Sequence, residues 1–418
     1  MKWLAASLAL IALATGRGAA AQTAMPSGAP ALGEVAAVRV IGNQRTRSPV
    51  ILEAAGIAVG DRFEPGMADV IEQRVLNLRL FRAVDVTASS QGAHVDVAIQ
   101  VVERWTLLPI PFVAGSSRGM RGGAYLLESN LLGWNKLVVL GAIYSGGEGP
   151  SAFALYRDPS VAGTRGLFRA MARYGDLLRE QYRGADRVYA YRDGRVDLSA
   201  SGGYAVRPWL SLFAGGYAVP AWSEAVEGEA APPEAGTVFG WSAELELRAQ
   251  DFHLYFNEGV SGRLSYRQAR EDLGAARDVL ELSTHVQVAR PVFGDQSIAV
   301  TGQAWWNRGD PVLDAVLMGG LPGSRGFERL GAWAERAASA VVEHQVPVFR
   351  TSWGIWTANT FAEAGASEWR GRRDGWVTPG VGFRLYLLGV AFPALGVDAA
   401  YSLDDDRVLG MASFGFSQ

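Results

Sequence analysis

Residues that could do covalent chemistry are few and scattered along the chain. There is no cysteine, which excludes a disulfide scaffold, a thiolate metal site and a cysteine nucleophile. Residues 115–119 match G-x-S-x-G, but that nucleophile elbow must lead from a strand into a helix, and the residues from Met120 onward have the pattern of a strand. The histidines form no metal-binding motif; they are His94, His253, His285 and His344. We therefore predict that the protein is not an enzyme and holds no cofactor and no metal.

Composition narrows the class of protein further. The chain has 418 residues, of which 49% are hydrophobic and 19% charged, and it carries 51 glycines. The low charged fraction and the aromatic content of 10% argue against a disordered chain. A net charge of −3 argues against a generally basic nucleic-acid binder, so no nucleic-acid partner is expected.

The N-terminus has the pattern of a secretory signal peptide. Lys2 precedes the apolar segment 3–15, and Arg17 and three alanines at 19–21 follow it. The alternative, a membrane anchor, fits less well because this segment is shorter than the roughly 20 residues of a spanning helix. We predict a signal peptide over 1–21, cleaved after Ala21, so that the mature chain lies beyond the inner membrane.

Residues 22–34 read as a linker rich in Pro, Gly and Ala, and residues 35–104 as a compact mixed domain. Ser48 is expected to cap the first helix, with Pro49 after it and Gly56 as its end. Apolar residues at helical spacing predict the second helix, and alternating residues predict the strands. The expected order is strand, helix, helix, strand, strand, over 38–43, 48–56, 67–78, 81–87 and 95–101.

From 105 to 418 helical periodicity disappears and alternating segments of about 10 residues recur, as expected for membrane-spanning strands. In 239–248, Phe239 and Trp241 alternate with Gly240 and Ser242. A soluble β-sandwich also alternates, but it buries bulky apolar side chains, whereas charged residues and glycine recur here on the presumed inner face. We predict an outer-membrane β-barrel of about 16 strands; counting alone also allows 14 or 18.

Several short motifs carry a resemblance to a known family. In the 35–104 domain they are Val38–Asn43 with Thr46, Gly60–Asp61, Leu78–Val86 and Val95–Glu103. In this order they resemble the BamA/TamA-type outer-membrane protein assembly superfamily, the bacterial surface antigen family. Its members combine periplasmic POTRA domains with a 16-stranded barrel. Structural roles are expected for a turn with positive φ at Gly42-Asn43 and for Phe81 in the core.

The barrel resembles the same family at a long loop, 308–333, and at a later strand. The loop contains Arg325-Gly326-Phe327, which matches the Arg-Gly-aromatic tip that folds back into the lumen in the family. The strand segment Phe361–Gly365 matches the family's Phe-x-Asp-x-Gly, with Glu363 in place of Asp. An arginine in a confined lumen needs a carboxylate, so we hypothesise that Arg325 forms a bidentate pair with Glu363 and pins the loop. Gly365 would leave room for the loop; the alternative is a solvated Arg325.

The last strand is expected at 408–416, where Phe414 and Phe416 share a face. The resemblance implies that this strand closes the barrel against the first strand and serves as the signal for insertion. The first strand is expected within 106–116 and contains Pro109 and Pro111. Proline belongs at the edge of a sheet, so this seam could be weak, although both prolines could also precede the strand. Weaker family matches lie at 130–133 and 251–259.

The resemblance implies a function in assisting the insertion, assembly or translocation of other outer-membrane proteins. Unfolded outer-membrane protein clients would be captured by the POTRA sheet edge and passed to the seam. Outer-membrane lipid and accessory periplasmic proteins or lipoproteins are further expected partners. The expected location is the bacterial outer membrane with the POTRA domain in the periplasm. A two-partner-type secretion pore for a dedicated substrate and a passive outer-membrane channel remain alternatives.

Overall fold

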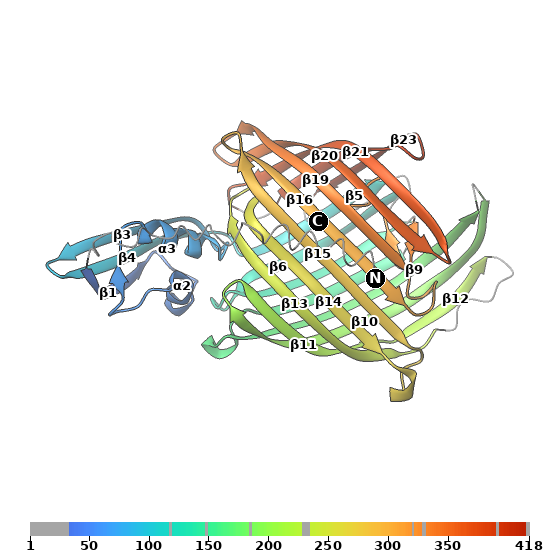
Figure 1. The fold of residues 1–418 in the computed structure, drawn as a ribbon, viewed down its shortest axis with the longest axis horizontal. Coiled ribbons are helices and arrows are strands. Elements are labelled where there is room, and N and C mark those ends of the chain that lie inside the picture. Colours follow the sequence, from blue (N-terminus) through green and yellow to red (C-terminus); the bar gives the residue numbers. More distant parts are fainter. Residues whose placement is uncertain are drawn as a thin grey trace.

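The computed structural model describes residues 33–414 apart from 117–118, 147–148, 184–185, 228–234, 320–321, 328–331 and 390–392. A small α+β domain lies at one end of a large closed barrel (Figure 1). The predicted signal peptide lies outside the described residues. Of the predicted linker only residues 33 and 34 are described, and they begin the first strand instead of preceding it.

The small domain contains a four-stranded sheet in the order β2-β1-β4-β3 and two helices. Strand β1 is parallel to β4, whereas the other pairs are antiparallel. A two-residue strand, β2, was not predicted. The elements are β1 (Gly33–Ile41), α2 (Ser48–Ala55), β2 (Arg62–Phe63), α3 (Met67–Leu76), β3 (Phe81–Gln91) and β4 (His94–Glu103).

Local contacts explain where α2 begins and ends. The prediction that Ser48 caps this helix is wrong: Arg47 is the N-cap residue, and it makes no side-chain cap bond. The Ser48 hydroxyl instead accepts a hydrogen bond from Asn43 Nδ2 at 3.1 Å, which closes the preceding turn. Gly42 supplies the positive φ of that turn, at 90°, and Gly56 ends the helix in the left-handed region at 62°.

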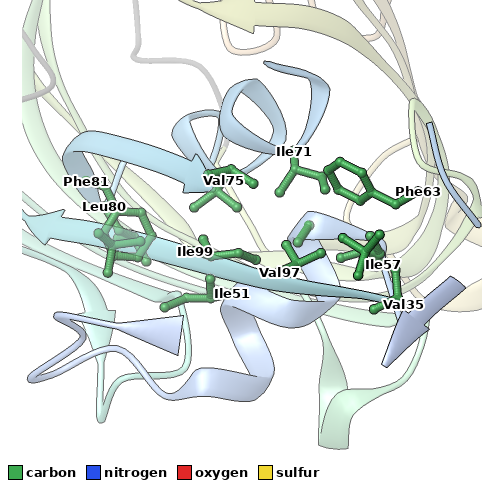
Figure 2. Packing of buried hydrophobic residues seen from close by; sticks show 14 residues of the cluster. Val35, Ile51, Ile57, Phe63, Ile71, Val75, Leu80, Phe81, Val97 and Ile99 are labelled. Carbon is green, nitrogen blue, oxygen red and sulfur yellow. The ribbon is translucent and has the colours of Figure 1, made fainter. Parts of the chain in front are cut away.

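The core of this domain lies between the two helices and the sheet (Figure 2). Ile51 of α2 and Val75 of α3 are fully buried against Ile99 of β4. Phe81, at the start of β3, also has no exposed surface. Apolar burial on one face of each helix therefore fixes the helices on one side of the sheet and leaves the strand edges uncovered by them.

The barrel wall is a closed antiparallel sheet built from 17 strand segments of the described residues. β11 and β12 flank Pro220 and both pair with β10, so they are two parts of one strand and the wall has 16 strands, as predicted. Its first members are β5 (Leu107–Ser116), β6 (Gly119–Leu131), β7 (Lys136–Ser145), β8 (Gly149–Asp158), β9 (Gly166–Arg183), β10 (Asp186–Arg207), β11 (Leu210–Val219) and β12 (Ala221–Glu227). The others are β13 (Val238–Phe252), β14 (Asn257–Ala269), β15 (Val279–Val292), β16 (Gln296–Arg308), β19 (Arg336–Arg350), β20 (Gly354–Trp369), β21 (Arg372–Leu387), β22 (Pro393–Ser402) and β23 (Arg407–Phe414).

Alternation along the strands separates a polar interior from an apolar exterior. On β21, Val381 and Phe383 are about half exposed on the outside, whereas Arg384 between Phe383 and Leu385 is buried inside. On β20, Glu363 is 1% exposed and faces the lumen. The fold is therefore a transmembrane antiparallel β-barrel with one small α+β domain, which confirms the predicted fold class.

Three further features bear on function. Within the described part of the chain, no helix is long and apolar enough to cross a membrane. The described residues also include no cluster of three or more histidine or acidic side chains arranged to hold a metal ion. The G-x-S-x-G match joins β5, which ends at Ser116, to β6, which begins at Gly119, so no helix follows it.

Candidate functional site

The long connection between β16 and β19 enters the barrel lumen and ends against its wall. It contains two short paired strands, β17 (Val316–Met318) and β18 (Ala332–Ala334). The backbone N–H groups of Gly323 and Arg325 donate to the two carboxylate oxygens of Glu363, each at 2.9 Å. Arg325 is only 2% exposed. The loop tip is therefore bound by its own backbone to one carboxylate on β20.

The Arg325 guanidinium lies among three carboxylates from three different strands. Its distances are 3.2 Å to Glu363, 3.1 Å to Glu343 on β19 and 3.6 Å to Asp398 on β22. It also stacks over the Phe361 ring at 4.0 Å. The structure thus brings the predicted partners Arg325 and Glu363 together. The predicted bidentate pair is not the arrangement seen, because the Glu363 oxygens accept backbone N–H groups and the guanidinium is shared.

A tryptophan on the neighbouring strand completes the contact with the loop. Trp376 Nε1 donates to the Gly323 carbonyl at 3.1 Å, and its ring meets Phe327 edge-on at 5.0 Å between centroids. A Cβ on Gly365 would collide with the Trp376 indole, and a Cβ on Gly326 would collide with the Thr378 hydroxyl. Gly365 therefore makes room for Trp376, which holds the loop, and not for the loop directly as expected.

Three residues of this site were missed in the sequence. Glu343, Asp398 and Trp376 all surround the loop tip, and Asp398 in addition binds Arg384 through two contacts of 2.7 and 2.9 Å. For Asp398 the available signal was a lone carboxylate in the otherwise apolar part of β22, and for Glu343 it was an acidic residue within a membrane-spanning strand. Their proximity to Arg325 depends on the loop conformation, which strand alternation does not specify.

The seam joins the first strand of the wall, β5, to the last, β23. Within the described residues, Val113 to Gly115 of β5 pair with Ala412 to Phe414 of β23, and on its other side β5 pairs with β6 from Leu107 to Ser116. Pro109 and Pro111 lie within β5 and not before it. Phe414 is the last described residue of β23 and pairs with Val113; Phe416 lies outside the described residues.

The small domain contacts the barrel through two turns at its near end. The Asn130 amide donates to the Thr46 hydroxyl at 2.9 Å, and the Arg47 N–H donates to the Gly133 carbonyl at 3.0 Å. Asn77 accepts from the Phe252 N–H at 2.8 Å. The barrel residues of these contacts belong to the two segments that matched the family more weakly, 130–133 and 251–259. Their polar residues thus position the small domain against the barrel.

A partly buried arginine, Arg79, lies in this junction. Arg79 donates to the Asn257 side chain at 2.9 Å and stacks on Phe252 at 4.9 Å. Burial, together with repulsion from Arg248 and Arg104, lowers the pKa of Arg79 to about 10. The side chain remains cationic at neutral pH and is held there by an amide and a ring. Holding the charged Arg79 side chain in this junction therefore costs free energy, because the side chain is desolvated and lies near two other arginines.

Within the part of the chain that the structure describes, the sheet of the small domain has an open edge. Strand β3 pairs with β4 on one side only, while β2 covers just Gly33 and Glu34 of β1. An unpaired edge of this length offers backbone donors and acceptors to an extended peptide.

Fold and site together define a transmembrane β-barrel with a lumen-inserted loop and an attached small domain. Residues 33–104 match the family model POTRA, surface antigen variable number repeat. No curated protein matches the chain. The structure of BamA from Haemophilus ducreyi lacking POTRA domains 1–3 is similar at 15% identity with a TM-score of 0.56, covering 92% of this chain and 85% of that one.

Two structures of CdiB are also similar, each at 13% identity and over 92% of this chain. The structure from Acinetobacter baumannii has a TM-score of 0.61, and the match covers 74% of its chain. The structure from Escherichia coli has a TM-score of 0.62, and the match covers 76% of its chain. At these identities the likeness shows the barrel fold. The family match is confined to residues 33–104, which identifies this part of the chain as a POTRA domain.

Proposed function

We propose that this protein assists the insertion or assembly of other outer-membrane proteins. The proposed clients are unfolded chains that the POTRA domain binds along the open edge of β3 and delivers to the seam between β5 and β23. The observation that carries the proposal is that β5, the first strand of the seam, contains Pro109 and Pro111, neither of which has a backbone N–H to donate to a neighbouring strand.

The energetic reasoning starts from unpaired backbone groups in the membrane. Each one costs several kcal/mol in lipid, so a seam strand that lacks two backbone donors favours the addition of a client strand. The part of β5 from Leu107 to Phe112 lies nearest the POTRA domain and contains both prolines. A client strand arriving from the periplasm would add to this part of the edge first. Its own folding would then supply the free energy for insertion.

A translocation pore is the second candidate, and the lumen provides its test. The loop tip occupies the lumen at the level of Glu363, so passage of a chain through the barrel requires the loop to leave this carboxylate. Insertion at the seam has no such requirement. Releasing the loop should therefore increase export if the protein is a pore, and should not improve assembly if the seam is the working site.

A disulfide across the seam tests the proposal directly, because the chain contains no other cysteine. Gly115→Cys with Ala412→Cys joins two register partners of β5 and β23. A matched control, Ala142→Cys with Ala152→Cys, joins register partners of β7 and β8 away from the seam. The readout is assembly of a β-barrel client in proteoliposomes, before and after reduction.

We expect oxidation to stop client assembly in the seam variant only, and reduction to restore it. Equal activity of the oxidised seam variant and the oxidised control would contradict the proposal. Loss of one secreted protein on depletion in cells, with other outer-membrane proteins unchanged, would favour the secretion pore. Pull-down from cells would then identify accessory periplasmic proteins or lipoproteins, which the proposal also includes.

A further inference from the structure

Strands β15, β16, β19 and β20 are neighbours in the barrel wall (Figure 1). Their outer surface carries a groove. Register places small side chains side by side across it: Thr284, Ala304, Ala338 and Ala366 are successive partners. Glu363 faces the lumen, so Ala366, three residues along the same strand, faces outward. A row of small residues on a lipid-facing wall lowers the surface locally and forms the groove.

The groove has the size for a segment of hydrocarbon. Its cavity volume is about 160 Å³. An apolar cavity of about 150 Å³ holds a molecule the size of benzene, so this one holds a short segment of one acyl chain. Thr284 and Ala304 form part of its floor and are less than a tenth exposed.

A polar row closes the groove at the end away from the POTRA domain. This row lies two residues beyond the row of small side chains on each strand. In it Trp306 is the register partner of Arg336, Arg336 is the partner of Glu368, and Glu368 is the partner of Arg373. In the opposite direction the outward residues become apolar again, as at Val342 and Val377, which are about half exposed. The groove therefore lies just below the boundary between the apolar band of the barrel and its far rim, with a tryptophan at that boundary.

The charges of this row favour an anion. Glu368 is paired with Arg373 at 3.1 Å. Arg336 lies over the Trp306 ring at 6.0 Å, and within the described part of the chain it forms no ion pair. The row thus has two arginines and one glutamate. Arg336, the arginine outside the ion pair, borders the apolar groove directly. Outer-leaflet lipids place a phosphate at this same boundary, above their acyl chains.

We infer that the groove binds one phosphorylated lipid of the outer leaflet, with an acyl chain over Ala304, Ala338 and Ala366 and its phosphate on Arg336. The guanidinium provides donors that match a phosphate, and the small side chains provide the space that the chain fills. The site requires only the transmembrane barrel. It lies on the outer face, away from the seam, and does not depend on an assembly or transport role.

The test uses the whole protein in nanodiscs of phosphatidylcholine with added lipid A, and counts retained lipid A by native mass spectrometry. Arg336→Gln removes the cation next to the groove, and Ala366→Phe fills the groove. The matched controls are Arg372→Gln, which changes an exposed arginine of the same rim, and Ala362→Phe, which adds a ring to the same face of β20 outside the groove. Heat-modifiable migration shows which variants fold.

A basic residue near a membrane surface contributes about 1 kcal/mol to the binding of an anionic lipid, which corresponds to roughly a fivefold change in affinity. We expect Arg336→Gln and Ala366→Phe each to reduce lipid A retention about fivefold, and both controls to retain it. If Ala366→Phe does not fold, Ala338→Leu replaces it. Equal retention by Arg336→Gln and Arg372→Gln, equal binding of dephosphorylated lipid, or crosslinking of the groove to a second copy of the chain would overturn the inference.

Discussion

Replacing Arg325 with alanine removes the cation that the described part of the loop places among Glu363, Glu343 and Asp398. The Arg325 and Glu363 side chains are 3% and 0% exposed, so water does not replace the lost guanidinium without rearrangement. Breaking a buried ion pair by removing one partner costs about 3–5 kcal/mol, because an uncompensated charge stays buried. We expect Arg325→Ala to lower the free energy of unfolding of the barrel by about this amount. The loop should also leave the lumen wall.

The free energy of unfolding is measured by urea titration of the protein refolded into lipid vesicles, followed by heat-modifiable migration. Arg372→Ala is the matched control, since its side chain is 80% exposed and pairs with Asp374 at 3.2 Å. A surface pair of this kind contributes between about 0 and 1 kcal/mol. A double-mutant cycle with Glu363→Gln then isolates the direct interaction, for which a coupling of about 0.5–3 kcal/mol is expected.

The reasoning is refuted if Arg325→Ala and Arg372→Ala lower stability equally. It is also refuted if the cycle gives no coupling, because the loop would then be held by the backbone bonds to Glu363 alone. If Arg325→Ala lowers stability strongly but shows no coupling to Glu363→Gln, Arg325 stabilises the loop by packing over Phe361 and not by its charge.

Three further predictions follow from the same contacts. Gly365→Ala should push the Trp376 indole from its place and destabilise the barrel by about 1–3 kcal/mol in the same titration, while Gly202→Ala, with no atom near its added Cβ, should not. Trp376→Phe removes the hydrogen bond to the loop and should cost about 0.5–1.5 kcal/mol; an unchanged midpoint would show that the bond contributes nothing. Asn77→Ala removes the acceptor of the Phe252 N–H, so hydrogen exchange at that amide should accelerate about tenfold, and an unchanged exchange rate would exclude this contact as a POTRA anchor.

Much of the architecture follows from local sequence patterns. Alternation at period two, as in 239–248, specifies a strand with one lipid-facing side, and its repetition through residues 105–418 predicts a closed wall. Gly42 and Gly56 mark their turns because only the backbone conformation matters there. The N-cap of α2 could not be predicted in the same way. The Ser48 hydroxyl accepts a hydrogen bond from the Asn43 side chain, and this bond depends on the fold of the preceding turn.

The sequence by itself determined the class of protein, the order of its two parts and the predicted partners Arg325 and Glu363, because periodicity and motif are local. Only the tertiary structure decided that Arg325 is shared with Glu343 and Asp398, since these residues come from strands far apart in the chain. The same holds for the lipid-facing groove. Each alanine in it is unremarkable in its own strand, and the groove exists only because the register of four strands places small side chains at one height.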